Sequence, residues 1–141
     1  MIDKLQQAFK EATATFREQA SQLGNNAKEK TYQLIEDWLK VFPKLEIYGL
    51  EINSFAFNLA FNPSLEVEML GLHEKFTMDR IDQILSENKK DPAILSVMNT
   101  IKMTYNLHKR TYGDRKEPLI VKIKVKVTPE IKVFIGKPLI E

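Results

Sequence analysis

Two stretches of the chain, residues 53–70 and 119–136, alternate apolar and polar side chains. Each stretch is interrupted near its middle by a proline between polar residues, Pro63 in the first and Pro129 in the second. Alternation with a period of two is typical of a strand with one buried face, and proline presets the backbone for an inner turn position. The two stretches therefore predict two β-hairpins. In any fold of this chain, each hairpin must pair with further strands or have its apolar face covered by other elements.

Apolar residues at intervals of three and four predict a helix before the first hairpin, over roughly residues 27–41. Proline lacks the backbone N–H that a helix interior uses, so we expect this helix to end at Pro43. Residues 45–70 are then interpreted as strands. Their alternation changes phase near Gly49, which predicts a bend or a bulge there.

Two more helices are expected before the second hairpin. The helical spacing resumes at Thr77, breaks after residue 87 and resumes again after Asp91. Asp91 followed by Pro92 is typical of an N-cap with proline at the first helical position. Gly113 is expected to end the last helix.

The two hairpins superpose when the chain is shifted by 66 positions, which brings Pro63 onto Pro129. Apolar positions then coincide, although alternation alone guarantees half of that agreement. We interpret the pattern as an internal repeat of two α-β-β units, residues 27–71 and 77–137, whose hairpins are related by a pseudo-twofold axis. The expected fold class is α+β: residues 27–141 form a single domain, in which one antiparallel sheet of four to five strands carries helices on one face.

Residues 1–23 are expected to form a separate amphipathic helix, which ends where Gly24 begins a run of weak helix formers. Their apolar residues make one narrow stripe, close to a coiled-coil seam. The positive and negative charges of this segment balance, so electrostatic attraction to an anionic lipid surface would be weak. We expect the helix to mediate oligomerisation or docking to a protein partner. The residues of its apolar stripe that are nominated for this interaction are Ile2, Leu5, Phe9 and Phe16.

The 141-residue chain has no cysteine, which excludes disulfides, thiolate nucleophiles and thiolate-held metals. Its first residues do not have the basic start and apolar run of a signal peptide. No apolar run approaches the roughly 20 residues that a membrane span needs. We therefore expect a cytoplasmic protein without a membrane span.

Residues with recognisable catalytic chemistry are scarce. His73 and His108 lie outside any metal-binding spacing, and the sequence has no phosphate-loop or nucleophile-elbow motif. Carboxylates such as Asp79 and Asp82 are better explained by a solvated helix face. We predict no catalytic residue, no cofactor and no metal site, and a protein that is not an enzyme.

Positive charge is concentrated late in the chain, where residues 102–141 hold 10 of the 21 Lys and Arg but only 4 of the 19 Asp and Glu. Clustered cations near an aromatic side chain such as Tyr112 can bind a phosphate backbone. In the expected sheet, however, Glu66 and Glu68 would oppose the strand lysines and neutralise them. The candidate nucleic-acid residues are Lys109, Arg110, Arg115, Lys116, Lys122, Lys124 and Lys126.

These patterns favour a non-catalytic protein-binding or assembly module, which self-associates or docks through its N-terminal helix. Its partner would be another protein or a second copy of the chain. One alternative is a nucleic-acid-binding protein that uses the basic C-terminal part. Another is a carrier of an apolar small molecule or lipid in a sheet-helix cavity, although phenylalanines in such positions more often fill a core. The candidate residues of the carrier are Phe55, Phe57, Leu59 and Phe61.

Overall fold

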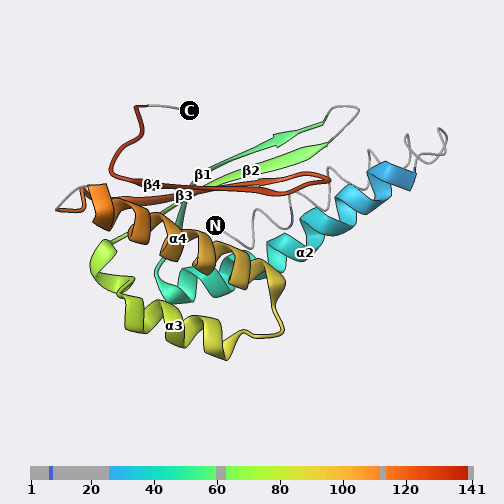
Figure 1. Ribbon diagram of the computed structural model, residues 1–141. Coiled ribbons are helices and arrows are strands. Elements are labelled where there is room, and N and C mark those ends of the chain that lie inside the picture. Colours follow the sequence, from blue (N-terminus) through green and yellow to red (C-terminus); the bar gives the residue numbers. More distant parts are fainter. Residues whose placement is uncertain (1–6, 8–25, 60–62, 112–113, 140–141) are drawn as a thin grey trace.

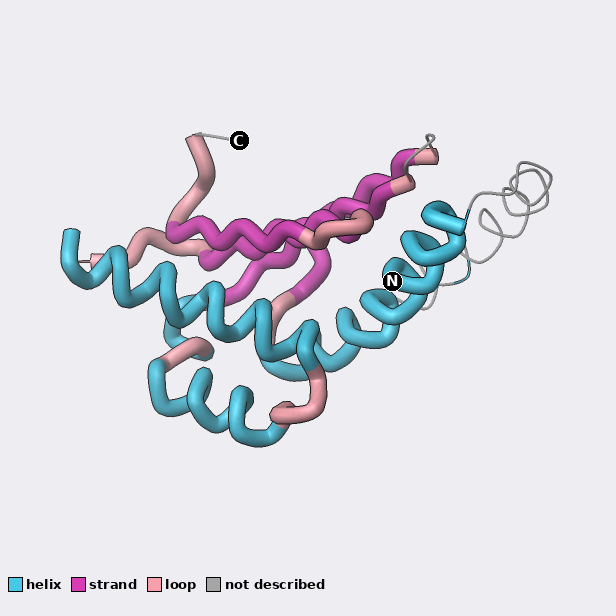
Figure 2. The backbone as a smooth tube through the Cα atoms, turned by 45° about the vertical axis from the view of Figure 1, so that its right-hand side comes forward, coloured by secondary structure: helices cyan, strands magenta, loops and turns pink. Residues whose placement is uncertain are grey.

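The described residues form a four-stranded antiparallel sheet with helices on one face (Figures 1 and 2). The computed structural model describes most of the chain, namely residues 7, 26–59, 63–111 and 114–139. The α+β class is therefore confirmed, whereas the helix expected over residues 1–23 lies outside the described residues except for Gln7. The elements in chain order are α2 (Asn26–Tyr48), β1 (Glu51–Asn58), β2 (Ser64–Gly71), the 3-10 helix η1 (His73–Lys75), α3 (Met78–Glu87), α4 (Pro92–Thr111), β3 (Leu119–Val125) and β4 (Glu130–Ile135).

Helix α2 continues through Pro43 to Tyr48, so the expectation that proline ends this helix is wrong. An interior proline costs about 3 kcal/mol because it removes a helical hydrogen bond and crowds the preceding turn. The apolar stripe continues past it, however, and Leu45 is as fully buried as Phe42. Burial of a leucine side chain contributes about 1.5–3 kcal/mol and offsets that cost. Residues 45–48 are therefore helical and do not begin a strand.

Helix α2 ends at Gly49, whose φ of +116° is a conformation that residues with side chains rarely adopt. The Leu50 N–H donates to the Leu45 carbonyl and the Gly49 N–H donates to the Glu46 carbonyl, both at 3.0 Å. This pair of bonds is a Schellman motif, which satisfies carbonyls that the helix end would leave unpaired. The bend expected near Gly49 is confirmed, and a β-bulge follows early in β1.

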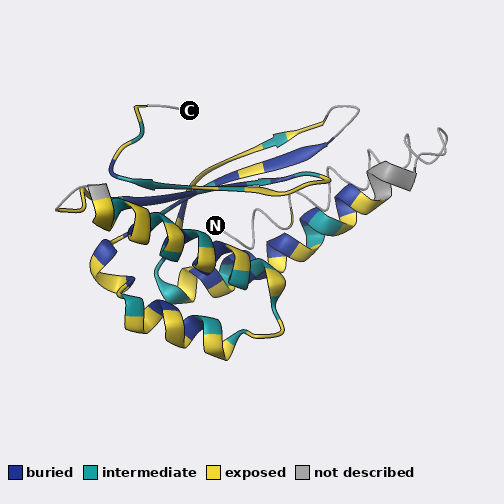
Figure 3. Cartoon of the chain, in the orientation of Figure 1, coloured by how far each residue is buried: buried dark blue, intermediate teal, exposed yellow. Residues whose placement is uncertain are grey.

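The strands pair in the order β1-β2-β3-β4, and every neighbouring pair is antiparallel. The central strands β2 and β3 turn every second side chain toward the helices, and these side chains are almost completely buried (Figure 3). The core lies between these two strands and the helix layer. Its strand members include Leu65, Val67 and Met69 from β2 and Val121, Ile123 and Val125 from β3.

The two hairpins lie side by side because β2 pairs with β3, with Leu65 opposite Val125 and Gly71 opposite Leu119. Antiparallel pairing at every step makes β1 and β3 run in the same direction. The second hairpin is therefore related to the first by a step across the sheet, and the expected pseudo-twofold axis is wrong. The internal repeat itself stays a prediction, with one helix before the first hairpin and two before the second.

The two helices between the hairpins begin where the helical spacing resumes, and each has a side-chain cap at its start. The Thr77 side chain accepts a hydrogen bond from the Arg80 N–H at 3.2 Å at the start of α3. Asp91 accepts from the Ile94 N–H at 3.4 Å, and Pro92 is the first residue of α4. Side-chain caps of this kind satisfy backbone donors that the first turn leaves unpaired.

Replacement of Pro43 by alanine should stabilise the protein, because it restores a backbone N–H in the middle of α2. We expect the free energy of unfolding to rise by about 1–3 kcal/mol. Urea denaturation followed by circular dichroism measures the change. Lys40→Ala, at an exposed position of the same helix, is the matched control and should shift stability by less than about 0.5 kcal/mol. A destabilised Pro43→Ala variant would show instead that the packing of α2 needs the proline.

Candidate functional site

Of the strand lysines, Lys122 and Lys124 lie on the sheet face that points away from the helices, where carboxylates oppose them across the β2–β3 register, and Lys126 follows directly after β3. Each has an acidic partner: Lys122 with Glu68 at 3.8 Å, Lys124 with Glu66 at 3.4 Å, and Lys126 with Glu130 at 3.0 Å. The hydrogen bond from Lys126, and then its charge, lowers the pKa of the Glu130 carboxyl. Three of the nominated nucleic-acid contacts are therefore paired within the chain.

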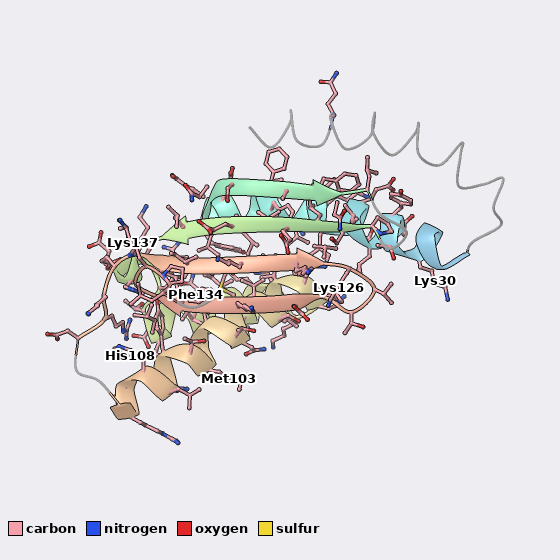
Figure 4. All side chains as sticks on the ribbon, turned by 90° about the horizontal axis from the view of Figure 1, so that it is seen from above. Lys30, Met103, His108, Lys126, Phe134 and Lys137 are labelled. Carbon is pink, nitrogen blue, oxygen red and sulfur yellow. The ribbon has the colours of Figure 1, made fainter. Side chains whose placement is uncertain are left out.

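The other four nominated cations lie at the opposite end of β3. Lys109 and Arg110 belong to the last turn of α4, and Arg115 and Lys116 to the segment before β3. Figure 4 shows this separation, with His108 at one end of the sheet and Lys126 at the other. Within the described ranges, none of these four cations forms a salt bridge. The seven cations thus do not form one surface.

His73 is buried and ties three segments together. Its Nε2 lies 2.7 Å from the Lys116 carbonyl oxygen, and its Nδ1 lies 2.7 Å from the Tyr105 hydroxyl oxygen. A carbonyl can only accept, so Nε2 carries the proton and Nδ1 of the neutral ring accepts from the Tyr105 hydroxyl. The backbone N–H of His73 also donates to both carboxylate oxygens of Glu117 at 3.3 Å. These contacts join η1, α4 and the segment before β3.

Tyr105 connects this buried histidine to the protein surface. Its ring meets the His73 ring edge-on, with centroids 5.5 Å apart. The Arg115 guanidinium carbon lies 4.1 Å from the Tyr105 ring centroid. Burial raises the pKa of the Tyr105 phenol to about 12, although the Arg115 charge acts in the opposite direction. The Tyr105 ring therefore contacts both the buried His73 and the exposed Arg115.

A hollow of about 320 Å³ opens beside Arg115, and we call it the α4 hollow. Lys109 and Arg115 belong to the same set of candidate nucleic-acid residues predicted from the sequence, whereas Tyr105 was not a candidate site residue. The Tyr105–Arg115 contact joins residues from a helix and a loop, and no spacing in the sequence signals it. The residues that line the hollow are Met78, Tyr105, Asn106, His108, Lys109 and Arg115.

The apolar side chains of β1 are the second candidate surface. Phe55 pairs with Val67 and Phe57 with Leu65, so they belong to the sheet face that carries the core. Phe55 is nevertheless 46% exposed and Leu59, just after β1, is 50% exposed. We call Phe55, Phe57 and Leu59 the β1 strip. The expectation that these residues fill the space between sheet and helices is wrong for Phe55 and Leu59, because β1 lies at the edge of the sheet.

Two of the predicted sites, Phe61 and the apolar stripe of the N-terminal segment, lie outside the described residues. The apolar-ligand interpretation of the phenylalanines stays a prediction.

A separate hollow of about 560 Å³ lies between α2, the start of α4 and the β3–β4 turn, with Trp38, Val41 and Ile131 in its lining. Its lining comes from three segments that are distant in the sequence, so no local pattern predicts it.

The Tyr105 phenol generates a prediction at high pH. The unfolded phenol ionises near pH 10 and the folded one near pH 12, so the unfolded state binds fewer protons between these values and stability falls as pH rises. The wild-type protein should be more stable than Tyr105→Phe below about pH 10, by about 1–2 kcal/mol, because His73 loses its donor in the variant.

That advantage should shrink by about 1 kcal/mol at about pH 11. Urea denaturation of both proteins, from about pH 8 to about pH 11, measures it. Because both proteins carry the same lysines, the difference between them isolates the phenol. A difference that stays constant over this range would mean that the folded phenol titrates like an exposed one.

In the part of the chain that the structure describes, no group of three His, Cys, Asp or Glu residues is placed to hold a metal ion. The same described residues contain no helix with the length and apolar character needed to cross a bilayer. Comparison with protein-family models, with curated proteins and with solved structures gave no match.

Proposed function

We propose that this protein is a non-catalytic assembly module, in which the amphipathic segment 1–23 of one copy binds the β1 strip of a second copy. The observation that carries the proposal is the exposure of Phe55, on the core side of the sheet, and of Leu59 just beyond β1. Burial of one such side chain contributes about 1.5–3 kcal/mol. A partner that covers the strip would therefore gain binding free energy from surface that the helix layer leaves open.

The position of the strip indicates what kind of partner fits. Side chains on this sheet face point toward the helix layer, so an additional helix beside α2 would extend that layer over β1. An amphipathic helix of residues 2–23 would be about 33 Å long. The β1 strip, from residue 55 to residue 59, spans about 13 Å. Phe9 and Phe16 of the apolar stripe would lie about 10 Å apart along such a helix, so both could contact the strip.

The connection between the segment and α2 supports exchange between two copies. α2 begins at the end of the molecule where β1 finishes (Figures 1 and 2). Gly24 and Asn25 come between the segment and α2 in the sequence, and residues of these types favour a change of direction. Reciprocal exchange of such an element covers both strips with the same contacts, as in a twofold-symmetric dimer.

The contacts of His73 support a non-catalytic role. Both of its ring nitrogens are engaged, one with Tyr105 and one with the Lys116 carbonyl, which leaves neither for proton transfer to a substrate. The two alternative functions have less support. The strand lysines of the nucleic-acid alternative are paired with carboxylates, and the carrier alternative needs enclosed phenylalanines, whereas Phe55 is half exposed.

Sedimentation of the full chain and its variants tests the proposal. We expect the full chain to dimerise, and the double variants Phe55→Ser/Leu59→Ser and Phe9→Ser/Phe16→Ser each to be monomeric, because each removes one side of the same apolar interface. Removal of residues 1–23 should leave a folded monomer. Thermal unfolding of each variant separates loss of association from loss of folding.

Met103→Ser is the matched control, since Met103 is 65% exposed on α4, away from β1 (Figure 4). This variant should dimerise like the wild-type protein. A full chain that sediments as a monomer would contradict the proposal. So would a truncated chain that unfolds, because the segment would then belong to the core of its own chain.

A further inference from the structure

We propose that the α4 hollow is a binding site for the phosphate group of a small phosphorylated molecule. The proposal starts from the Arg115 side chain, which lies over the Tyr105 ring at 4.1 Å and lines the hollow together with Lys109. At about 320 Å³ the hollow is at the small end of ligand pockets. It can take a phosphate group with a small organic part.

Arg115 is held in place by a chain of contacts that begins in the protein interior. The His73 side chain, 6% exposed, accepts a hydrogen bond from the Tyr105 hydroxyl, and the Tyr105 ring supports the guanidinium. The guanidinium carries five N–H donors in a planar fork. Such a fork matches two oxygens of a phosphate. Because Arg115 is already positioned, binding costs less side-chain entropy.

The charges around the hollow favour an anion. Lys109 and Arg115 have no salt-bridge partner among the described residues, in contrast to the strand lysines. Two acidic residues, Asp114 and Glu117, lie in the same segment as Arg115, but neither lines the hollow.

The simplest other explanation of these cations is the helix dipole. Lys109 lies in the last turn of α4, where a positive charge stabilises a helix without any ligand. That explanation does not extend to Arg115, which lies beyond the helix and is placed by Tyr105. Arg115 is therefore the residue on which the proposal depends, and Lys109 adds a second charge.

Titration of the full chain with inorganic pyrophosphate, followed by NMR of backbone amides and arginine Nε–H groups, tests the site. We expect saturable shifts at Asn106, Lys109 and Arg115. Arg115→Gln should weaken binding by about tenfold or more, because it removes a charge-assisted pair of hydrogen bonds. Lys124→Gln removes the same unit of charge from the outer sheet face and should leave the affinity unchanged.

Two variants of Tyr105 separate the ring from the hydroxyl. Tyr105→Phe keeps the platform under Arg115 and should bind within about threefold of the wild-type protein, whereas Tyr105→Leu removes the platform and should bind about tenfold more weakly. Equal shifts at all surface lysines, with Arg115→Gln binding like the wild-type protein, would overturn the proposal. Binding of a short single-stranded oligonucleotide without binding of pyrophosphate would also overturn it, and would assign these cations to a nucleic-acid backbone.

Discussion

The antiparallel pairing of β2 with β3 is the constraint on which the rest of the structure depends. It joins two hairpins, each of which would be marginally stable alone, into one sheet. Its register places Val67 opposite Ile123 on the helix side and Glu66 opposite Lys124 on the other side. One pairing thus creates both the apolar face that the helices cover and the charge-paired face that solvent meets. A slip of one residue would exchange the two faces and bury the charges.

The same pairing decides which strands lie at the edges. With β2 and β3 in the centre, β1 is left at one edge, and the helix layer covers the central strands better than it covers β1 (Figure 3). Phe55 consequently has the strand position of a core residue and nearly half of its surface exposed. Edge strands with exposed apolar side chains are usual sites of association, and natural proteins protect or use them. The proposed assembly surface follows from this topology.

The second surface depends on the contacts of His73. This residue follows β2 and binds Tyr105 of α4 and the Lys116 carbonyl just before β3, so it fixes the route of the chain from α4 back into the sheet. Arg115 lies in the same segment as Lys116, so the contacts of His73 also determine the position of Arg115 over Tyr105. The α4 hollow is built from residues that the β1 strip does not share, so loss of association would leave the hollow's lining intact.

The sequence by itself determined the features that depend on near neighbours: two hairpins from alternation, the starts of α3 and α4 from Thr77 and Asp91, and the α+β class. It misjudged Pro43, because the burial of Leu45 in the core outweighs a local penalty. It also grouped seven cations that lie at two ends of a strand. Strand order, the exposure of Phe55 and the meeting of Tyr105 with Arg115 were decided only by the tertiary structure. Each of these depends on which distant segments pack together. Alternation or helical spacing predicts on which face of its own element a side chain lies, but it does not predict which other element covers that face.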